Sequence, residues 1–297
     1  MSTPQRRHNL SAIVWMLAAV GVLSLMDAAM KWLAPHYPPL QVAAMRGAAS
    51  LPIVLVWLAL RGGLRQVVTG RWGLQLARGA MSVLMLTCFI YAVRALPLAD
   101  AYSIFFVSPL LITALSVPFL GEHVDARRWA AIGVGLLGVL VVLRPTGAGT
   151  LTLAGVAALV AATCYSLSAI AMRVLGRTDS TESMMFWFTA MVALGAGALA
   201  APHWVALKPE HWPLLAAVAV TGALGQYAIT EAFRRGEVSV VAPFEYTAIG
   251  WGVGLDWILW SSRPQARMLA GAAIVIAAGL YLLQRERSRP PLEPEHP

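Results

Sequence analysis

Ten long apolar runs constrain this chain more than any other feature of its sequence. A helix that crosses the hydrocarbon core of a bilayer needs about 20 apolar residues, and its backbone polar groups must be satisfied inside the segment itself. The runs cover residues 11–33, 38–60, 74–93, 97–119, 128–143, 151–174, 182–201, 212–233, 238–260 and 267–283. We therefore predict an all-α polytopic membrane protein, with ten transmembrane helices embedded in the lipid bilayer.

The composition agrees with this class of protein. Hydrophobic residues make up 59% of the 297 residues, and charged residues make up 12%. Soluble domains carry about 25% charged residues. The formal net charge of +8 raises the question of a nucleic-acid partner. The basic residues are dispersed at the ends of apolar runs and cannot form a basic groove, so we expect no nucleic-acid partner.

The basic residues also predict the orientation of the chain. Cytoplasmic loops of membrane proteins carry an excess of Lys and Arg. With the N-terminus inside, 14 of the 22 basic residues fall on the cytoplasmic side and 5 on the opposite side. Both termini are therefore predicted to be cytoplasmic.

A short internal repeat indicates how the spans are organised. Residues 24–33 match residues 166–175 at an offset of 142, with Lys31 replaced by Arg173. Each copy opens a set of five spans, and an odd number inverts the second set relative to the first, as in alternating-access transporters. The prediction is two inverted five-helix repeats with a disordered cytoplasmic tail. Their boundaries are 1–144 for the first repeat, 151–286 for the second and 287–297 for the tail.

Several motifs give the chain a family resemblance. They stand at Pro109, Gly121–Glu122, residues 128–143, residues 242–247 and residues 279–286. In these segments the chain resembles the EamA family of the drug/metabolite transporter superfamily. The resemblance implies a bacterial inner-membrane transporter with a central cavity lined by helices 1, 3, 4, 6, 8 and 9. Members of the family export amino acids, as the YddG-type aromatic amino acid exporters do, or import S-adenosylmethionine or riboflavin.

Some positions depart from the family pattern or break the repeat. Ser262 stands where the first repeat has Glu122, and Ile249 stands where it has Pro109. The loop that closes the second half therefore lacks its structural acid. The short glycine-rich runs at 128–143 and 267–283 are each expected to brace their own half, since small residues let helices approach closely.

Charged residues inside the spans need a partner or a cavity, because a charge at the bilayer centre costs about 2.5–3.5 kcal/mol on insertion scales. Asp27 and Arg46 lie at similar depths in the first and second spans, so we predict that they are near each other, with Lys31 one turn from Asp27. Two interpretations are open. The carboxylate either locks the two helices as an ion pair, or it contacts a substrate ammonium or a coupling proton.

Polar and aromatic side chains within the spans predict the substrate site. Tyr102, Phe106 and Pro109 share one face of the fourth span, and Pro109 there frees a backbone carbonyl. Aromatic stripes also serve packing, but stripes that include hydroxyl groups favour a mostly apolar pocket for a zwitterionic or aromatic metabolite. Glu245 either neutralises the basic residues at 234–235 or contacts substrate. The substrate-binding candidates are Ser24, Asp27, Thr87, Tyr91, Tyr102, Phe106, Tyr165, Gln226, Thr230 and Tyr246, and the structural or gating candidates are Arg46, Pro109, Glu122, Pro243 and Glu245.

Catalytic motifs are missing from the sequence. All six histidines fall in predicted loops or tails, and there is no Gly-x-Ser-x-Gly, His-Glu-x-x-His or P-loop. We therefore predict no enzymatic activity, no metal and no cofactor. The predicted function is transport of small organic metabolites, as a monomeric amino acid exporter that works by alternating access. Uptake of S-adenosylmethionine or riboflavin is the alternative, and a channel or a membrane-embedded enzyme would be another class.

Overall fold

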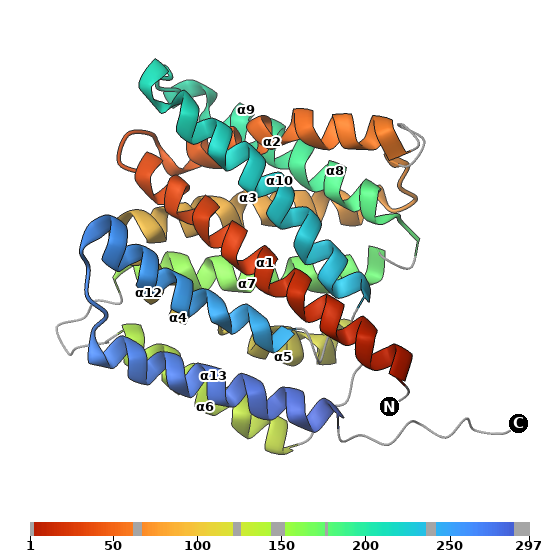
Figure 1. The fold of residues 1–297 in the computed structure, drawn as a ribbon, viewed down its shortest axis with the longest axis vertical. Helices are drawn as coiled ribbons and strands as arrows, with labels where there is room; N and C mark the ends of the chain where they lie inside the picture. Colours follow the sequence, from red (N-terminus) through yellow and green to blue (C-terminus); the bar gives the residue numbers. More distant parts are fainter. Residues whose placement is uncertain are drawn as a thin grey trace, which may run out of the picture.

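The computed structural model is a bundle of helices (Figure 1). It describes residues 3–61, 67–120, 126–143, 152–175, 178–235 and 242–287, and no strand occurs within these ranges. The helical elements are α1 (Thr3–Leu33), α2 (Pro39–Arg61), α3 (Trp72–Ala95), α4 (Leu98–Phe105), α5 (Ser108–Leu120), α6 (Ala126–Leu143), α7 (Leu153–Leu175), α8 (Thr181–Met191), the π-helix η2 (Val192–Ala196), α9 (Gly197–Ala200), η3 (Ala201–His203), η4 (Pro209–His211), α10 (Trp212–Arg235), η5 (Ala242–Tyr246), α12 (Thr247–Trp260) and α13 (Ala266–Arg287).

Six helical stretches are long and apolar enough to cross a membrane, among the residues that the structure describes. They are Ser11–Leu33, Pro39–Leu60, Trp72–Ala95, Leu153–Met172, Glu182–His203 and Pro209–Ile229. Shorter apolar helices occur at Leu98–Ile112, Trp129–Gly138 and Ala266–Tyr281. The predicted class of all-helical membrane protein is therefore confirmed. The segment between the two predicted repeats, residues 144–151, and the tail from residue 288 lie outside the described residues.

The predicted span over residues 97–119 is not one continuous helix, because the chain forms α4 and α5 there. The Phe106 N–H still donates to the Tyr102 carbonyl at 2.9 Å, but α4 then stops and α5 starts two residues later. Pro109 stands in the first turn of α5, where a missing N–H leaves no helical bond unmade. The proline therefore begins a helix, and the expected gap within a continuous helix is not formed.

The second departure from regular helix is the π-helix η2, which follows α8. Gly47 of α2 packs directly against it: a Cβ at this position would come within 2.5 Å of the Ala193 backbone nitrogen and 2.9 Å of its Cα. A single π-turn inserts an extra residue into a helix and is frequent at functional sites. Here it brings the backbones of α2 and η2 together.

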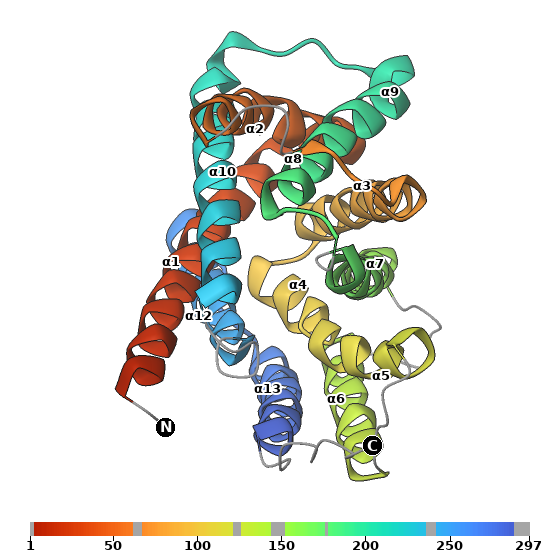
Figure 2. The ribbon, with the colours of Figure 1, turned by 90° about the vertical axis from the view of Figure 1, so that its right-hand side faces the viewer.

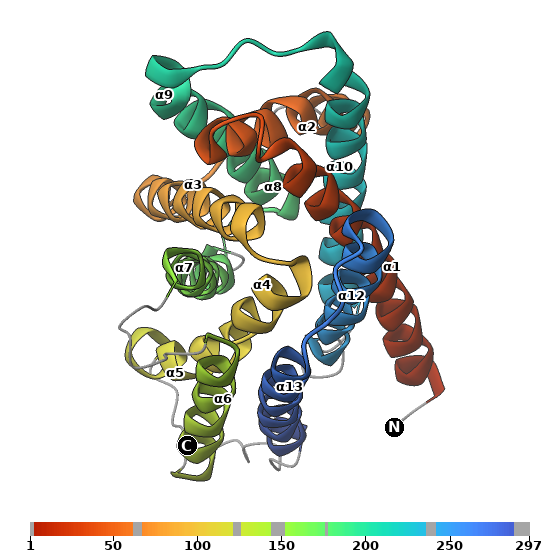
Figure 3. The same ribbon diagram turned by 90° about the vertical axis from the view of Figure 1, so that its left-hand side faces the viewer.

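Helices from the first half of the sequence pack in pairs with helices from the second half. Helix α1 packs against α10, α3 against α7, and α6 against α13, while α4 contacts both α7 and α12 (Figures 2 and 3). Figure 2 shows α2 and α8 at one edge of the bundle and α6 and α13 at the opposite edge. Gly138 of α6 lies against α13, where an added Cβ would stand 3.0 Å from the Gly271 carbonyl oxygen. The glycine-rich helices therefore brace each other, which corrects the expectation that each braces its own half.

Two hydrophobic clusters fill the interior. One centres on α4 and includes Tyr102, Phe106 and Tyr246, and the other joins the second half of α1 to α2 and α3. Met26 belongs to the second cluster and Ala28 to the first. The side chain between them, Asp27, therefore lies where the two clusters meet.

Candidate functional site

Asp27 is held by hydrogen bonds inside the bundle. The Tyr102 hydroxyl on α4 donates to Asp27 Oδ2 on α1 at 2.7 Å. The Ser24 side chain, three residues before Asp27 and therefore on the same face of α1, also hydrogen-bonds to Tyr102. Ser24 and Tyr102 are 1% and 4% exposed. Three of the predicted site residues thus form one buried polar group that joins α1 to α4.

Aromatic rings continue from this polar group across the interior. The Tyr102 ring lies 6.0 Å from Phe106, and Phe106 lies 5.4 Å from Tyr246, measured between ring centroids. Phe105, the neighbour of Phe106, lies 5.2 Å from Tyr165 of α7. The Tyr246 hydroxyl is buried and has no hydrogen-bond partner among the described residues. The structure therefore brings four predicted aromatic residues together, with one free hydroxyl among them.

Asp27 and Arg46 are close enough to attract each other, as predicted, but they form no ion pair within 4.0 Å. The Arg46 Nε–H instead donates to the Met26 sulfur at 3.3 Å. Thioether sulfur is a weak acceptor. The Asp27 carboxylate is therefore satisfied mainly by Tyr102, and the guanidinium remains largely available.

Lys31 has a different partner from the predicted one. Its Nζ lies 2.8 Å from Asp256 Oδ1 on α12, and it sits 4.5 Å from the centroid of the Trp260 ring. The other carboxylate oxygen of Asp256 accepts the Ala99 N–H at 3.0 Å. The ion-pair partner of Lys31 is therefore Asp256, which sequence reasoning missed. The signal was present, because Asp256 is an acid inside an apolar run.

Arg46 lines a small pocket between α2, α8 and α10. The other polar or aromatic residues around it are Ser50, Phe188, Thr189 and Gln226. The free volume is about 20 Å³, which is room for about one water molecule. Gly222 helps to keep it open, because a Cβ there would stand 3.0 Å from the Ser50 hydroxyl. The predicted site residue Gln226 thus meets Arg46 at this pocket.

The remaining predicted residues lie elsewhere. The Thr87 hydroxyl donates to the Val83 carbonyl of its own helix at 2.7 Å, and Tyr91 is 37% exposed. Glu122 and the side chains of Thr230 and Pro243 lie outside the part of the chain that the structure describes.

Glu245 lies in the short helix η5, which directly precedes α12. Its carboxylate interacts electrostatically with the Tyr165 and Tyr246 hydroxyls. The side chains at 234–235, which were its predicted partners, are outside the described set. The acid therefore joins the aromatic group around Phe106, on the α7 and α12 side of the bundle.

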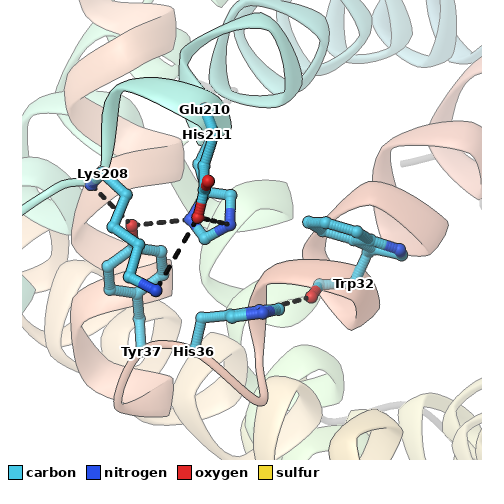
Figure 4. Close-up of polar contacts among 6 residues, drawn as sticks. All are labelled: Trp32, His36, Tyr37, Lys208, Glu210 and His211. Carbon is cyan, nitrogen blue, oxygen red and sulfur yellow. Dashed lines mark hydrogen bonds and ion pairs between the residues drawn. The ribbon is translucent and has the colours of Figure 1, made fainter.

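Loop contacts join the two halves of the sequence at the end of the bundle where α1 finishes; we call them the first seam (Figure 4). The Tyr37 hydroxyl shares a hydrogen bond of 2.7 Å with His211 Nδ1 and accepts the Lys208 N–H at 3.1 Å. Gln41 makes two hydrogen bonds with the Val205 backbone, at 2.7 and 2.9 Å. The His36 ring lies 4.7 Å from the buried His211 ring. These bonds fix the loop before α2 to the loop before α10.

A second seam lies at the other end of α2. The buried Asp179 accepts hydrogen bonds from the Thr69 hydroxyl and from Gln75 Nε2. The Val67 carbonyl accepts from the Trp187 ring nitrogen at 2.8 Å. The segment before α3 is therefore fixed to the segment before α8.

Comparison with known protein families shows which family this sequence belongs to. The model of the EamA-like transporter family matches residues 10–144 and 152–284. The chain belongs to the EamA-like transporter family. This EamA-like protein is 29% identical to the pseudopaline exporter CntI of Pseudomonas aeruginosa over 280 residues, which are 93% of this chain and 97% of the exporter. It is 25% identical to a riboflavin transporter of Vibrio cholerae, with 96% of each protein covered.

Other comparisons agree. The EamA-like protein is 25% identical to an S-adenosylmethionine uptake transporter of Rickettsia felis, with 94% of each chain covered. A solved crystal structure has the same fold, with a TM-score of 0.65 and 20% identity over 94% of this chain and 99% of the other. The family resemblance predicted from the motifs is therefore confirmed, and the protein is a membrane transporter of small molecules.

Proposed function

We propose that this protein exports amino acids or similar small zwitterionic metabolites across the bacterial inner membrane by alternating access. The observation that carries the proposal is the Asp27 group. The Asp27 carboxylate accepts a hydrogen bond from Tyr102, which Ser24 contacts in turn, and it has no cation within ion-pair distance, so it offers a site for a substrate ammonium. The rings of Phe106 and Tyr246 offer an apolar surface beside it. Convergent polar groups in an apolar site are typical of small-molecule binding.

The packing pairs support an inverted repeat of residues 1–144 and 151–286. At an offset of about 140 residues, α1 corresponds to α7, α3 to α10, and α6 to α13. Exchanging the halves turns the α1–α10 contact into the α7–α3 contact and maps the α6–α13 contact onto itself. The two seams exchange in the same way, since Tyr37 and Asp179 are 142 residues apart. This pattern is expected of ten spans in two halves related by an axis in the membrane plane.

The mechanism that follows is rocking of the two halves about a midplane site, with both termini in the cytoplasm. The excess of basic residues in the loops on that side supports this orientation. Binding free energy in each state drives the exchange of conformations, and no covalent chemistry is required.

Counterflow in proteoliposomes tests the proposal. Vesicles loaded with an unlabelled amino acid should accumulate the labelled one, and Asp27→Asn should reduce this exchange by about tenfold or more, because it removes a charge-assisted contact. Tyr281→Phe removes a hydroxyl from an exposed position on α13 and serves as the control. Repeating the measurement with and without a pH gradient shows whether a proton is coupled.

The same assay separates the alternative functions. Relatives of similar identity are transporters of riboflavin and S-adenosylmethionine, so these two compounds belong in the panel. Counterflow with either, and with no amino acid, would make that compound the substrate in place of amino acids. Flux without counterflow would indicate a channel and would refute alternating access.

A further inference from the structure

Two arginines inside the membrane-spanning helices face one phenylalanine. The guanidinium carbons of Arg46 on α2 and Arg78 on α3 lie 5.7 and 5.6 Å from the centroid of the Phe188 ring on α8. These two carbons are therefore at most about 11 Å apart. Neither arginine forms an ion pair with an acid within 4.0 Å in the described part of the chain.

Arg78 is buried with most of its donors unused. It is 5% exposed, and a guanidinium has five N–H donors. Nη1 donates to the Met184 carbonyl at 3.0 Å, Nη2 reaches only the Met172 sulfur at 3.9 Å, and the buried Nε has no partner. Inside a membrane, a charged group in this condition marks a binding site.

Arg46 extends this site to the pocket. It lies between Asp27, which attracts it from α1, and the pocket that also contains Ser50 and Gln226. Asp27, Arg46 and Arg78 together carry a formal charge of about +1, so a ligand with one excess negative charge would neutralise the region. Glu245 is left out of this sum because its carboxylate lies near Tyr165 and Tyr246 of the aromatic group.

We propose that Arg46 and Arg78 bind carboxylate groups of the transported molecule, which makes the substrate class an anionic metabolite such as a dicarboxylic amino acid. The planar guanidinium fork matches a carboxylate with two parallel hydrogen bonds. Phe188 contacts both guanidinium groups through its ring by cation–π interaction, which does not occupy their N–H donors. The inference rests on the proposed function only in taking the ligand to be the transported one.

Glutarate, a simple dicarboxylate, is the probe. The thermal midpoint of the purified full chain in detergent should rise with glutarate, and should not rise with the neutral diamide glutaramide or with chloride at equal ionic strength. Arg46→Gln and Arg78→Gln should each weaken the apparent affinity by about tenfold or more. Arg94→Gln removes the same charge from an exposed position on α3 and should respond as the wild type does. An equal response in Arg78→Gln, or to glutaramide, would overturn the proposal.

Two further measurements keep the outcomes distinct. If a glutamine variant does not fold, Arg78→Lys keeps the charge but loses the fork, and its glutarate response should be weaker than that of the wild type; an equal response counts against the site. If glutarate binds but no amino acid exchanges in proteoliposomes, the anion site stands and the proposed export fails. If amino acids exchange equally in wild type and both glutamine variants, export stands and the anion site is refuted.

Discussion

Replacing Asp256 by alanine should destabilise the protein strongly, because it leaves Lys31 charged and unpaired. The two side chains are 3% and 11% exposed and their atoms are 2.8 Å apart, so solvent screens this pair little. The substitution also removes the acceptor of the Ala99 N–H. Lys31 lies on α1 and Asp256 on α12, so the change also breaks a link between the first and second halves of the sequence.

The size of the loss follows from this burial. Removing one partner of a buried ion pair costs about 3–5 kcal/mol. A loss of about 3 kcal/mol lowers the thermal midpoint of a protein of this size by roughly 5 °C. Replacing both charges together, as in Lys31→Met with Asp256→Leu, should cost less than Asp256→Ala alone, because no unpaired charge remains.

Circular dichroism melting in detergent measures these differences. Glu210→Gln is the matched control, since Glu210 pairs with Lys208 at 3.7 Å on the surface, where the two side chains are 67% and 61% exposed. Such a pair is worth about 0–1 kcal/mol. The reasoning is refuted if Asp256→Ala melts with the control, or if the double variant loses the sum of the two single losses.

Three other substitutions have expected outcomes. Tyr102→Phe should impair counterflow strongly while lowering stability by only about 1–3 kcal/mol, measured by transport and melting on the same preparation, because it removes one hydroxyl, with its hydrogen bonds to Asp27 and Ser24. Gly47→Ala should destabilise the protein by about 1–3 kcal/mol, because the added Cβ would overlap the Ala193 backbone. The control Gly133→Ala adds a Cβ in open space on a helix and should be neutral or stabilising. Equal melting temperatures of the two variants would contradict this reasoning. His211→Ala should lower the thermal midpoint, because it removes the hydrogen bond with Tyr37. The control His203→Ala changes an exposed side chain and should leave the midpoint unchanged. Protection of the first seam from proteolysis offers a second measurement.

The long helices could be predicted from the sequence because bilayer thickness sets the length of an apolar run. The predicted spans 11–33 and 38–60 end within one residue of α1 and α2. The break between α4 and α5 could not be predicted in the same way. Pro109 signals a helix boundary, but hydropathy continues through the boundary, and a proline in a first turn looks the same in sequence as one within a helix.

The composition of the site could be predicted better than its pairing. Tyr102 and Phe106 share one face of the fourth predicted span, so periodicity predicted that they lie together, and their rings are 6.0 Å apart. Asp27 was predicted as a site residue on another span, but its hydrogen bond with Tyr102 was not predicted. Lys31 was assigned to a neighbour one turn away, whereas its partner is 225 residues distant. Local spacing carries no information on such a contact, which depends on how α1 and α12 pack.

The two seams have a mechanical consequence. The first half of the sequence is fastened to the second half at two places, through Tyr37 before α2 and through Thr69 before α3. A body pinned at two points along one edge keeps a single rotational freedom, about the line that joins the pins. Motion that preserves both seams must therefore turn about the line that joins them, and α6 and α13, at the edge of the bundle opposite α2 and α8, sweep the longest arc (Figure 2).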